Sequence, residues 1–208
     1  MSTTTPAGPP IALSDPGSAR STRDRILDAA TELFYAHGIR AISADKIIER
    51  AGITKVTFYR HFRTKDALVL AYLERQAAWE RDTLGWLRES AGDDAEALRR
   101  FAAAVGAVTC KPGFRGCAFI NAAAEYADPD GPVRKVVAEH RAWYRELFAT
   151  MLGRLGVTDT AQAADELMML RDGAMVSGSL DEPSRVGDAL ERAIFAIVDA
   201  GRATRTID

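Results

Sequence analysis

Cysteine and histidine are scarce in this chain of 208 residues, which contains two cysteines and three histidines. Two cysteines cannot build the disulfide framework of a small secreted domain. His37, His61 and His140 stand apart and suggest no set of nucleophile, base and orienting group. Phosphate-binding glycine loops and the common hydrolase and metalloprotease motifs are also missing from the sequence. We therefore expect no enzymatic activity, no cofactor and no metal site.

Long apolar runs are missing as well. No window reaches the roughly 18 consecutive apolar residues of a membrane span, and the N-terminus lacks the apolar segment of a secretory signal. We expect a cytoplasmic protein that does not bind membranes. Residues 1–20 are rich in Thr, Pro, Gly, Ser and Ala, a composition that predicts a flexible arm. A hydrophobic content of 47% in the whole chain is ample for a core.

Charge is distributed unevenly, although the net charge is only -2. Residues 20–65 hold ten Lys and Arg against five Asp and Glu, whereas residues 66–208 hold seventeen against twenty-three. The first block therefore carries a net charge of +5 and the second a net charge of -6. This asymmetry favours contact between the first block and an anion.

Two short helices are predicted within residues 43–62. Ser43 can cap the first of them, and apolar residues recur there at helical spacing up to Ala51. Gly52 provides the backbone freedom for a tight turn, and Thr54 begins the second helix. An earlier helix opens with a capping box at Ser21 and ends at Gly38, and we expect it to pack behind the pair. This arrangement predicts a helix-turn-helix.

The second helix of this pair has two different faces. Phe58, Phe62 and the flank of His61 group on one side, which we expect to be buried, and the other side carries a cation, a hydroxyl and methyl groups suited to base edges. Lys65 begins the next helix, whose N-terminus can hold a phosphate. The predicted DNA contacts are Ser43, Thr54, Lys55, Val56, Thr57, Tyr59, Arg60, His61 and Lys65.

Residues 52–62, Gly-Ile-Thr-Lys-Val-Thr-Phe-Tyr-Arg-His-Phe, followed by Lys-Asp-Ala-Leu at 65–68, resemble the recognition-helix signature of the TetR family of transcriptional regulators. The resemblance covers about residues 22–73, and residues 115–125 are similar to a segment of one subgroup. Val56 and Ile48 depart from the commonest family pattern. The resemblance implies a homodimeric repressor that binds a pseudo-palindromic operator in double-stranded DNA and is released by a small-molecule effector.

Helical periodicity continues to the end of the chain, so the predicted fold is all-α. We expect a DNA-binding domain at 21–65 and a helical bundle for ligand binding and dimerisation at 66–208. Proline and glycine clusters separate the predicted helices. These helices span 65–89, 93–109, 116–127, 132–154, 160–180 and 184–202.

The last two predicted helices mix large apolar residues with small ones that permit close helix approach. In the TetR family these helices pair with their mates from a second subunit, and the resemblance implies the same interface here. An ordinary intramolecular bundle is the alternative interpretation.

A polar seam is predicted on the helix at 116–127, because Cys117, Asn121 and Glu125 recur at intervals of four residues. One interpretation is a pocket in which this seam orients an otherwise apolar ligand. The alternative is that the amide and the carboxylate bind partners within the bundle. The predicted ligand-binding residues are Cys117, Asn121 and Glu125, together with His140, Trp143 and Tyr144 on the following helix.

Cys110 and Cys117 leave two further alternatives open. They could form a thiol pair that senses oxidants, although such cysteines are more often small buried hydrophobic residues. A metal site of Cys117, Glu125 and His140 is disfavoured, because their spacing is ordinary helix periodicity. The alternative class of function is therefore a redox-sensing or ligand-binding helical protein that does not bind an operator.

Overall fold

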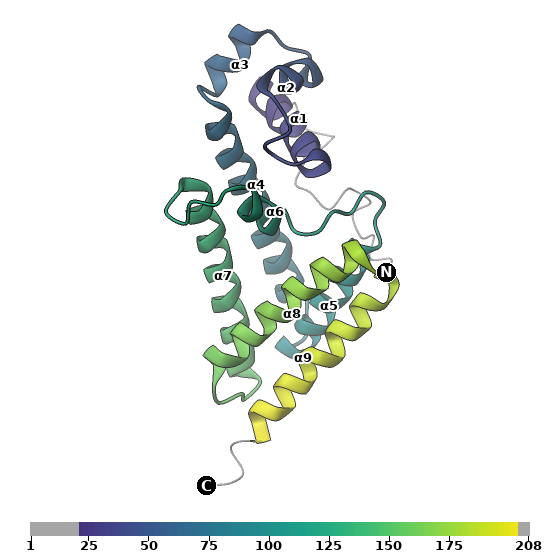
Figure 1. The fold of residues 1–208 in the computed structure, drawn as a ribbon. Helices are drawn as coiled ribbons and strands as arrows, with labels where there is room; N and C mark the ends of the chain where they lie inside the picture. Colours follow the sequence, from purple (N-terminus) through teal and green to yellow (C-terminus); the bar gives the residue numbers. More distant parts are fainter. Residues whose placement is uncertain (1–20, 204–208) are drawn as a thin grey trace. The chain divides into compact units, whose positions relative to one another are not determined.

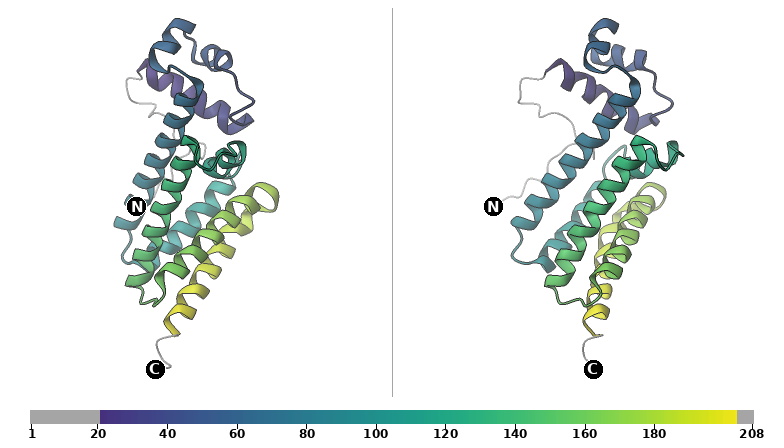
Figure 2. Two further views of the ribbon diagram at one scale, coloured as in Figure 1. Left: turned by 60° about the vertical axis from the view of Figure 1, so that its left-hand side comes forward. Right: turned by 90° about the vertical axis from the view of Figure 1, so that its left-hand side faces the viewer.

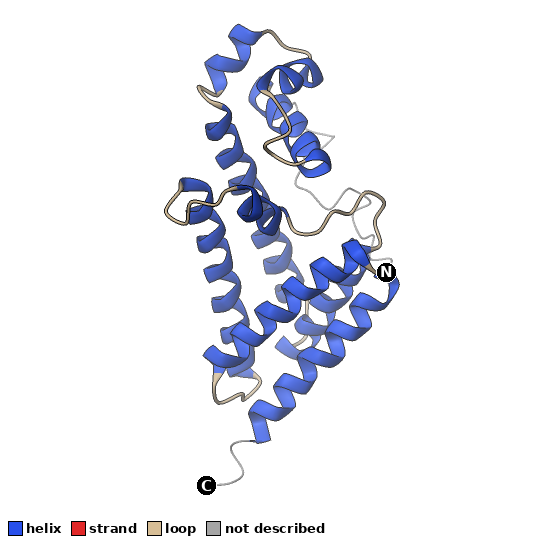
Figure 3. Ribbon diagram, viewed as in Figure 1, coloured by secondary structure: helices blue, strands red, loops and turns tan. Residues whose placement is uncertain are grey.

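The computed structural model describes residues 21–203, so the predicted arm at 1–20 lies outside the described residues. Every regular element in the described part is a helix, and no strand occurs there (Figure 3). The predicted all-α fold is confirmed. None of these helices combines the length and the apolar character needed to cross a membrane.

The order of the elements follows the predicted punctuation closely (Figure 1). The helices are α1 (Thr22–His37), α2 (Ala44–Ala51), α3 (Lys55–His61), α4 (Lys65–Glu89), α5 (Asp94–Thr109), α6 (Ala118–Glu125), α7 (Pro132–Arg154), α8 (Thr160–Leu180), the short 3-10 helix η1 (Pro183–Arg185) and α9 (Val186–Ala203).

Two helices differ from the prediction at their ends. The helix expected at 116–127 is shorter at both ends, because Gly116 takes a positive φ of 78° and α6 starts only at Ala118. The last helix starts two residues late, after η1 has formed with Pro183 at its first position. Cys117 therefore precedes α6 and does not lie on it.

The chain divides into two compact units, each described here by itself. One contains the residues up to Trp79 together with Ala118–Val137, and the other contains Glu80–Cys117 together with the residues from Ala138 onward. The first unit thus includes the start of α4, all of α6 and the beginning of α7 in addition to the residues 21–65 that we predicted as the DNA-binding domain.

Side-chain caps start α1, α2, α3 and α4. Ser21 and Asp24 form the predicted capping box, in which the serine hydroxyl accepts from the Asp24 N–H at 3.1 Å. Ser43 and Thr54 accept from the N–H groups three residues later, at 3.3 and 3.2 Å. Thr64 does the same at 3.0 Å for α4. Each cap satisfies a donor that has no partner inside its helix.

The turn between α2 and α3 is held from two sides. Gly52 has a φ of 63°, in the left-handed region that a turn of this kind requires. The Arg25 guanidinium, reaching from α1, donates to the carbonyl oxygens of Ala51 at 2.7 Å and of Gly52 at 3.3 Å. Ile47 and Phe58 are fully buried in this unit. Short helices with few internal hydrogen bonds are thus fixed by caps and by packing.

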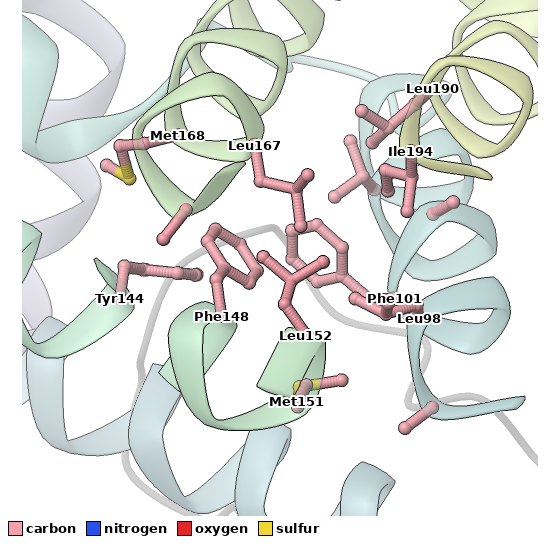
Figure 4. Packing of buried hydrophobic residues seen from close by; sticks show 14 of the residues in the cluster. Leu98, Phe101, Tyr144, Phe148, Met151, Leu152, Leu167, Met168, Leu190 and Ile194 are labelled. Atoms are coloured by element: carbon pink, nitrogen blue, oxygen red, sulfur yellow. The ribbon is translucent and has the colours of Figure 1, made fainter. Parts of the chain in front are cut away.

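The core of the second unit is formed by α5, α7, α8 and α9, together with Leu84 and Leu87 of α4. Figure 4 shows Phe101 and Phe148 between leucines of the neighbouring helices, with ring centroids 5.4 Å apart. Leu98, Leu152 and Leu167 are almost completely buried in the same cluster. Helix α9 packs on α5 and α8, and α8 and α9 run side by side in all views (Figure 2).

Candidate DNA-binding surface and ligand site

Helix α3 has the two faces that its sequence predicts. Phe58 and Phe62 are buried, whereas Val56 is 70% exposed and Tyr59 is 43% exposed. Lys55 and Arg60 are also exposed. Apolar and aromatic groups flanked by cations are thus free to meet base edges and phosphates.

His61 is fully on the exposed side, although its flank was predicted to group with the buried phenylalanines. The reason is its place as the last residue of α3, where the chain leaves the helix and turns towards Thr64. This position is compatible with the predicted contact to DNA, but the grouping with the core was wrong.

Three predicted DNA contacts have structural partners at helix starts. Ser43 caps α2, and Thr54 caps α3 by accepting from the Thr57 N–H. The hydroxyls of Thr54 and Thr57 are also 2.9 Å apart and share a hydrogen bond. These residues therefore fix the positive ends of α2 and α3, which favour nearby phosphates.

The two predicted lysine contacts differ in their surroundings. The Lys55 ammonium lies 3.4 Å from the Asp45 carboxylate, and both side chains are mostly exposed, so a phosphate can replace this weak pair. Lys65 is partly buried, and burial lowers the pKa of its ammonium, while the charges of Asp66 and Glu125 act in the opposite direction.

The predicted ligand residues do not form one seam. The Glu125 carboxylate accepts hydrogen bonds from the backbone N–H groups of Ile39 and Arg40, within the first unit. The Cys117 sulfur accepts from Nη1 of Arg171 at 3.2 Å, within the second unit. Asn121 is half-buried on α6. For Glu125 the structure therefore shows backbone partners, as the alternative interpretation expected.

His140 and Tyr144, by contrast, share a partner that the sequence did not reveal. Glu80 Oε2 accepts from the Tyr144 hydroxyl at 2.8 Å and lies 3.1 Å from Nε2 of His140. Arg171 Nη2 is 3.6 Å from the same oxygen. These contacts define a buried polar cluster that consists of Glu80, Cys117, His140, Tyr144 and Arg171.

The ionisation of this cluster follows from its contacts. Burial acts to raise the pKa of Glu80, but the hydrogen bonds from His140 and Tyr144 and the charge of Arg171 outweigh it and hold that pKa below its usual value. Burial and the Glu80 charge raise the pKa of the Tyr144 phenol. Glu80 is therefore a carboxylate at neutral pH and Tyr144 a neutral donor.

Trp143 connects the buried polar cluster to a groove. Its ring stacks on His140, with centroids 5.9 Å apart and planes inclined by 27°, and the Arg81 guanidinium lies 5.7 Å from its centroid. The groove has a volume of about 500 Å³, which is the size of many small-molecule sites. Its lining includes Arg81, Gly85, Arg88, Trp143, Leu147 and Arg154.

Sequence reasoning missed Glu80 and Arg171, the two charged residues of the buried polar cluster. A signal was present for Arg171, which continues the buried stripe of α8 between Leu167 and Ala174. A charge within an apolar stripe needs a buried counter-charge. The sequence could not show that Glu80 on α4 supplies it, because 91 residues separate the two.

Cys110 is exposed and Cys117 is buried, and both are free thiols. A group of three or more potential metal ligands does not occur among residues 21–203.

The exposed, cation-flanked second helix behind a glycine turn defines a helix-turn-helix DNA-binding protein. Residues 26–72 match the family "Bacterial regulatory proteins, tetR family", and residues 95–194 match "Tetracyclin repressor-like, C-terminal domain". The chain belongs to the TetR family of transcriptional regulators. Its family and fold are those of DNA-binding regulators and not those of enzymes.

Similar proteins support this assignment over different lengths. The crystal structure of SCO4454, a TetR-family regulator from Streptomyces coelicolor, is 38% identical, with a TM-score of 0.83 over 87% of this chain and 96% of that chain. The regulator TtgW of Pseudomonas putida is 42% identical over 65 residues, 31% of this chain and 48% of TtgW. The Escherichia coli repressor ComR is 29% identical over 123 residues, 58% of each chain. The chain thus spans only about half of these two curated relatives.

Proposed function

We propose that this protein is a homodimeric repressor that binds a pseudo-palindromic operator and is released by a small-molecule effector. In this proposal, two copies of α3 enter successive major grooves, each presenting Val56, Tyr59 and Arg60 to base edges. Lys55 and Lys65 neutralise phosphates on either side. Binding of the effector in the second unit changes the separation of the two α3 helices.

An exposed apolar face on α8 supports the dimer and is the observation on which the proposal depends most. Met169, Val176 and Leu180 are 66%, 45% and 76% exposed. Residues of this size are seldom left in water on one helix unless they form an interface. A second copy of the same chain presents the same apolar face and can cover it by two-fold symmetry.

A groove between α8 and α9 continues this face. It has a volume of about 410 Å³ and is lined by Met169, Leu170, Gly173, Ala174, Ser177, Asp181, Glu182, Arg185, Val186, Ala189, Leu190 and Ala193. Small residues along both helices permit the close approach of a partner helix. A helix of the second subunit is therefore the occupant that we propose.

Sedimentation of the purified protein and of two variants tests the dimer. Ala193→Glu places a carboxylate in the groove, and we expect monomers, because a buried unpaired charge is very costly. Ala138→Glu makes the same change at an exposed position of α7 and should leave the dimer intact. A wild-type monomer at micromolar concentration contradicts the proposed interface.

Operator binding is tested by selecting sequences from random DNA and by gel retardation on the DNA beside the gene. Repression predicts that the bound sequence overlaps a promoter and that transcription from it falls when the protein is added. A rise in transcription would replace the repressor by an activator, and failure to select any sequence would remove operator binding and leave a ligand-binding or redox-sensing role.

For the effector we propose the groove beside Trp143, backed by His140 and Tyr144. The indole wall and the nearby arginines suit a small, mostly apolar or aromatic molecule with one or two polar groups. A thermal-shift screen identifies candidates, and loss of the shift in Trp143→Ala checks the site.

A further inference from the structure

Val56 and Arg60 lie opposite the buried side of α3. Successive residues of a helix are turned by about 100° around its axis, so each of these two is roughly 160° from Phe58, which is fully buried. Thr57 and Tyr59 lie on the two flanks, at about 100° from Phe58. One short apolar side chain and one cation therefore form the middle of the exposed face.

The polar side chains next to Val56 already have partners within the first unit. The Lys55 ammonium is 3.4 Å from the Asp45 carboxylate, and the Thr57 hydroxyl shares a hydrogen bond of 2.9 Å with that of Thr54. Val56 itself is 70% exposed. Its methyl groups are thus free apolar surface at the start of α3.

An exposed valine brings no stability of its own to a helix. β-Branched residues lose side-chain freedom there and are poorer helix formers than alanine or lysine. Apolar surface that stays in water contributes no hydrophobic stabilisation. The methyl groups of Val56 become stabilising when a partner removes them from water, and the partner of this surface is DNA, because the chain is a DNA-binding regulator of the TetR family.

The major groove of DNA presents one methyl group, that of thymine. Guanine, adenine and cytosine are distinguished there by hydrogen-bond donors and acceptors, whereas thymine adds its C5 methyl group to the O4 acceptor. Apolar side chains contact this methyl group, but they offer no partner to the donors and acceptors of the other bases. A valine in the middle of the face that enters the groove therefore matches thymine.

We propose that Val56 is a specificity-determining residue that selects a thymine in each operator half-site by contact with the C5 methyl group. This inference rests on the proposed function, since it names one base of the operator. Arg60 is exposed one turn further along α3 and can donate two hydrogen bonds to guanine. The two residues are roughly 6 Å apart along the helix axis, and successive base pairs are about 3.4 Å apart. The half-site should therefore contain this thymine within a few base pairs of a guanine.

Deoxyuridine in place of thymidine tests the contact, because it removes the C5 methyl group and keeps the pairing with adenine. Each thymine of a selected operator is replaced in turn, in both half-sites at once. At one position we expect the affinity of the wild type to fall roughly fourfold for each half-site, which corresponds to the loss of one buried methyl group. Val56→Ala and Val56→Ser lack the methyl groups that reach the base, so each should bind the two operators with nearly equal affinity.

Two controls separate the methyl group from other effects. Cytosine at the same position should weaken binding of the wild type, and 5-methylcytosine there should restore roughly fourfold for each half-site. Lys55→Ala changes the neighbouring exposed side chain and should weaken both operators alike, so the ratio of their affinities stays as in the wild type. Because Val56 is exposed, its variants should unfold at the temperature of the wild type, which thermal unfolding checks.

The proposal is overturned if the selected half-site contains no thymine, or if every deoxyuridine replacement affects the wild type and Val56→Ala equally. Symmetrical protection of two half-sites in that case removes the methyl contact and leaves the proposed function in place. Failure to select any operator removes the proposed function and this inference together.

Discussion

The two units of this protein leave opposite kinds of surface uncovered. Helix α3 in the first unit exposes Lys55, Tyr59 and Arg60, which suit a polyanion. Helix α8 in the second unit exposes Met169 and Leu180, which suit an apolar partner. The comparison shows that one chain of nearly neutral net charge separates a charged exposed surface from an apolar one by placing them on different units.

The largest expected effect comes from removing the buried side of α3. Phe58 is fully buried, and Phe58→Ala should lower the free energy of unfolding by about 3–5 kcal/mol. Tyr59→Ala changes the neighbouring exposed ring and should leave stability nearly unchanged while weakening operator binding. Urea unfolding and operator titration of both variants separate the two faces, and equal destabilisation by both would contradict the assignment.

The next largest loss of stability is expected on changing the buried polar cluster of the second unit. Glu80→Gln leaves Arg171 with Asp172, at 3.2 Å, as its remaining carboxylate partner and should cost roughly 3 kcal/mol, the lower end for a broken buried pair. Because the folded-state pKa of Glu80 is lowered, its contribution to stability is present above the ordinary glutamate pKa and is lost as the pH falls through the folded value.

Urea unfolding between neutral pH and about pH 3 measures this pH dependence of stability, since ordinary glutamates titrate at about 4.3. The wild type should lose stability on acidification more steeply than Glu80→Gln. The same slope in both proteins would show that Glu80 has no depressed pKa.

A smaller change in binding free energy is expected when single DNA contacts are removed, and it should differ between base contacts and phosphate contacts. Arg60→Ala and Val56→Ala should each alter the preference among operator variants by about 1–3 kcal/mol, whereas Lys65→Ala should weaken all DNA alike and lower the salt slope by about one. Affinities for a small operator panel at several salt concentrations decide this. A uniform loss for Arg60→Ala would assign that side chain to phosphate.

The smallest effect is expected at a helix cap. Ser43→Ala removes the acceptor for the Lys46 N–H and should cost about 1 kcal/mol. Because α2 directly precedes α3, the helix that we propose to contact the bases, operator affinity should fall slightly as well. Thermal unfolding detects the change, and a loss of affinity without a loss of stability would make Ser43 a DNA contact in addition to a cap.

These contrasts also explain what the sequence could predict. Ser21, Ser43, Gly52 and Thr54 act on groups within a few residues, so their roles are readable from local spacing, and the structure confirms them. The partners of Glu125 are backbone N–H groups 85 and 86 residues away. No pattern of side chains marks such a partner.

The sequence predicted only some residues of the buried polar cluster. His140 and Tyr144 were predicted to share one face at helical spacing, and Cys117 was predicted as part of a polar seam on the helix at 116–127. Their common centre, Glu80, lies on α4 among exposed charges and carries no signal of its own in the sequence. Tertiary pairing of charges depends on the packing of distant helices, which periodicity does not specify.

The central claim is that two copies of this chain bind one operator through their α3 helices. Sedimentation of the protein on a selected operator, combined with footprinting, measures this directly. We predict two chains per operator and two protected half-sites whose centres lie about 34–36 Å apart, one turn of DNA. A complex of one chain with one half-site, or protection without sequence preference, would contradict the account.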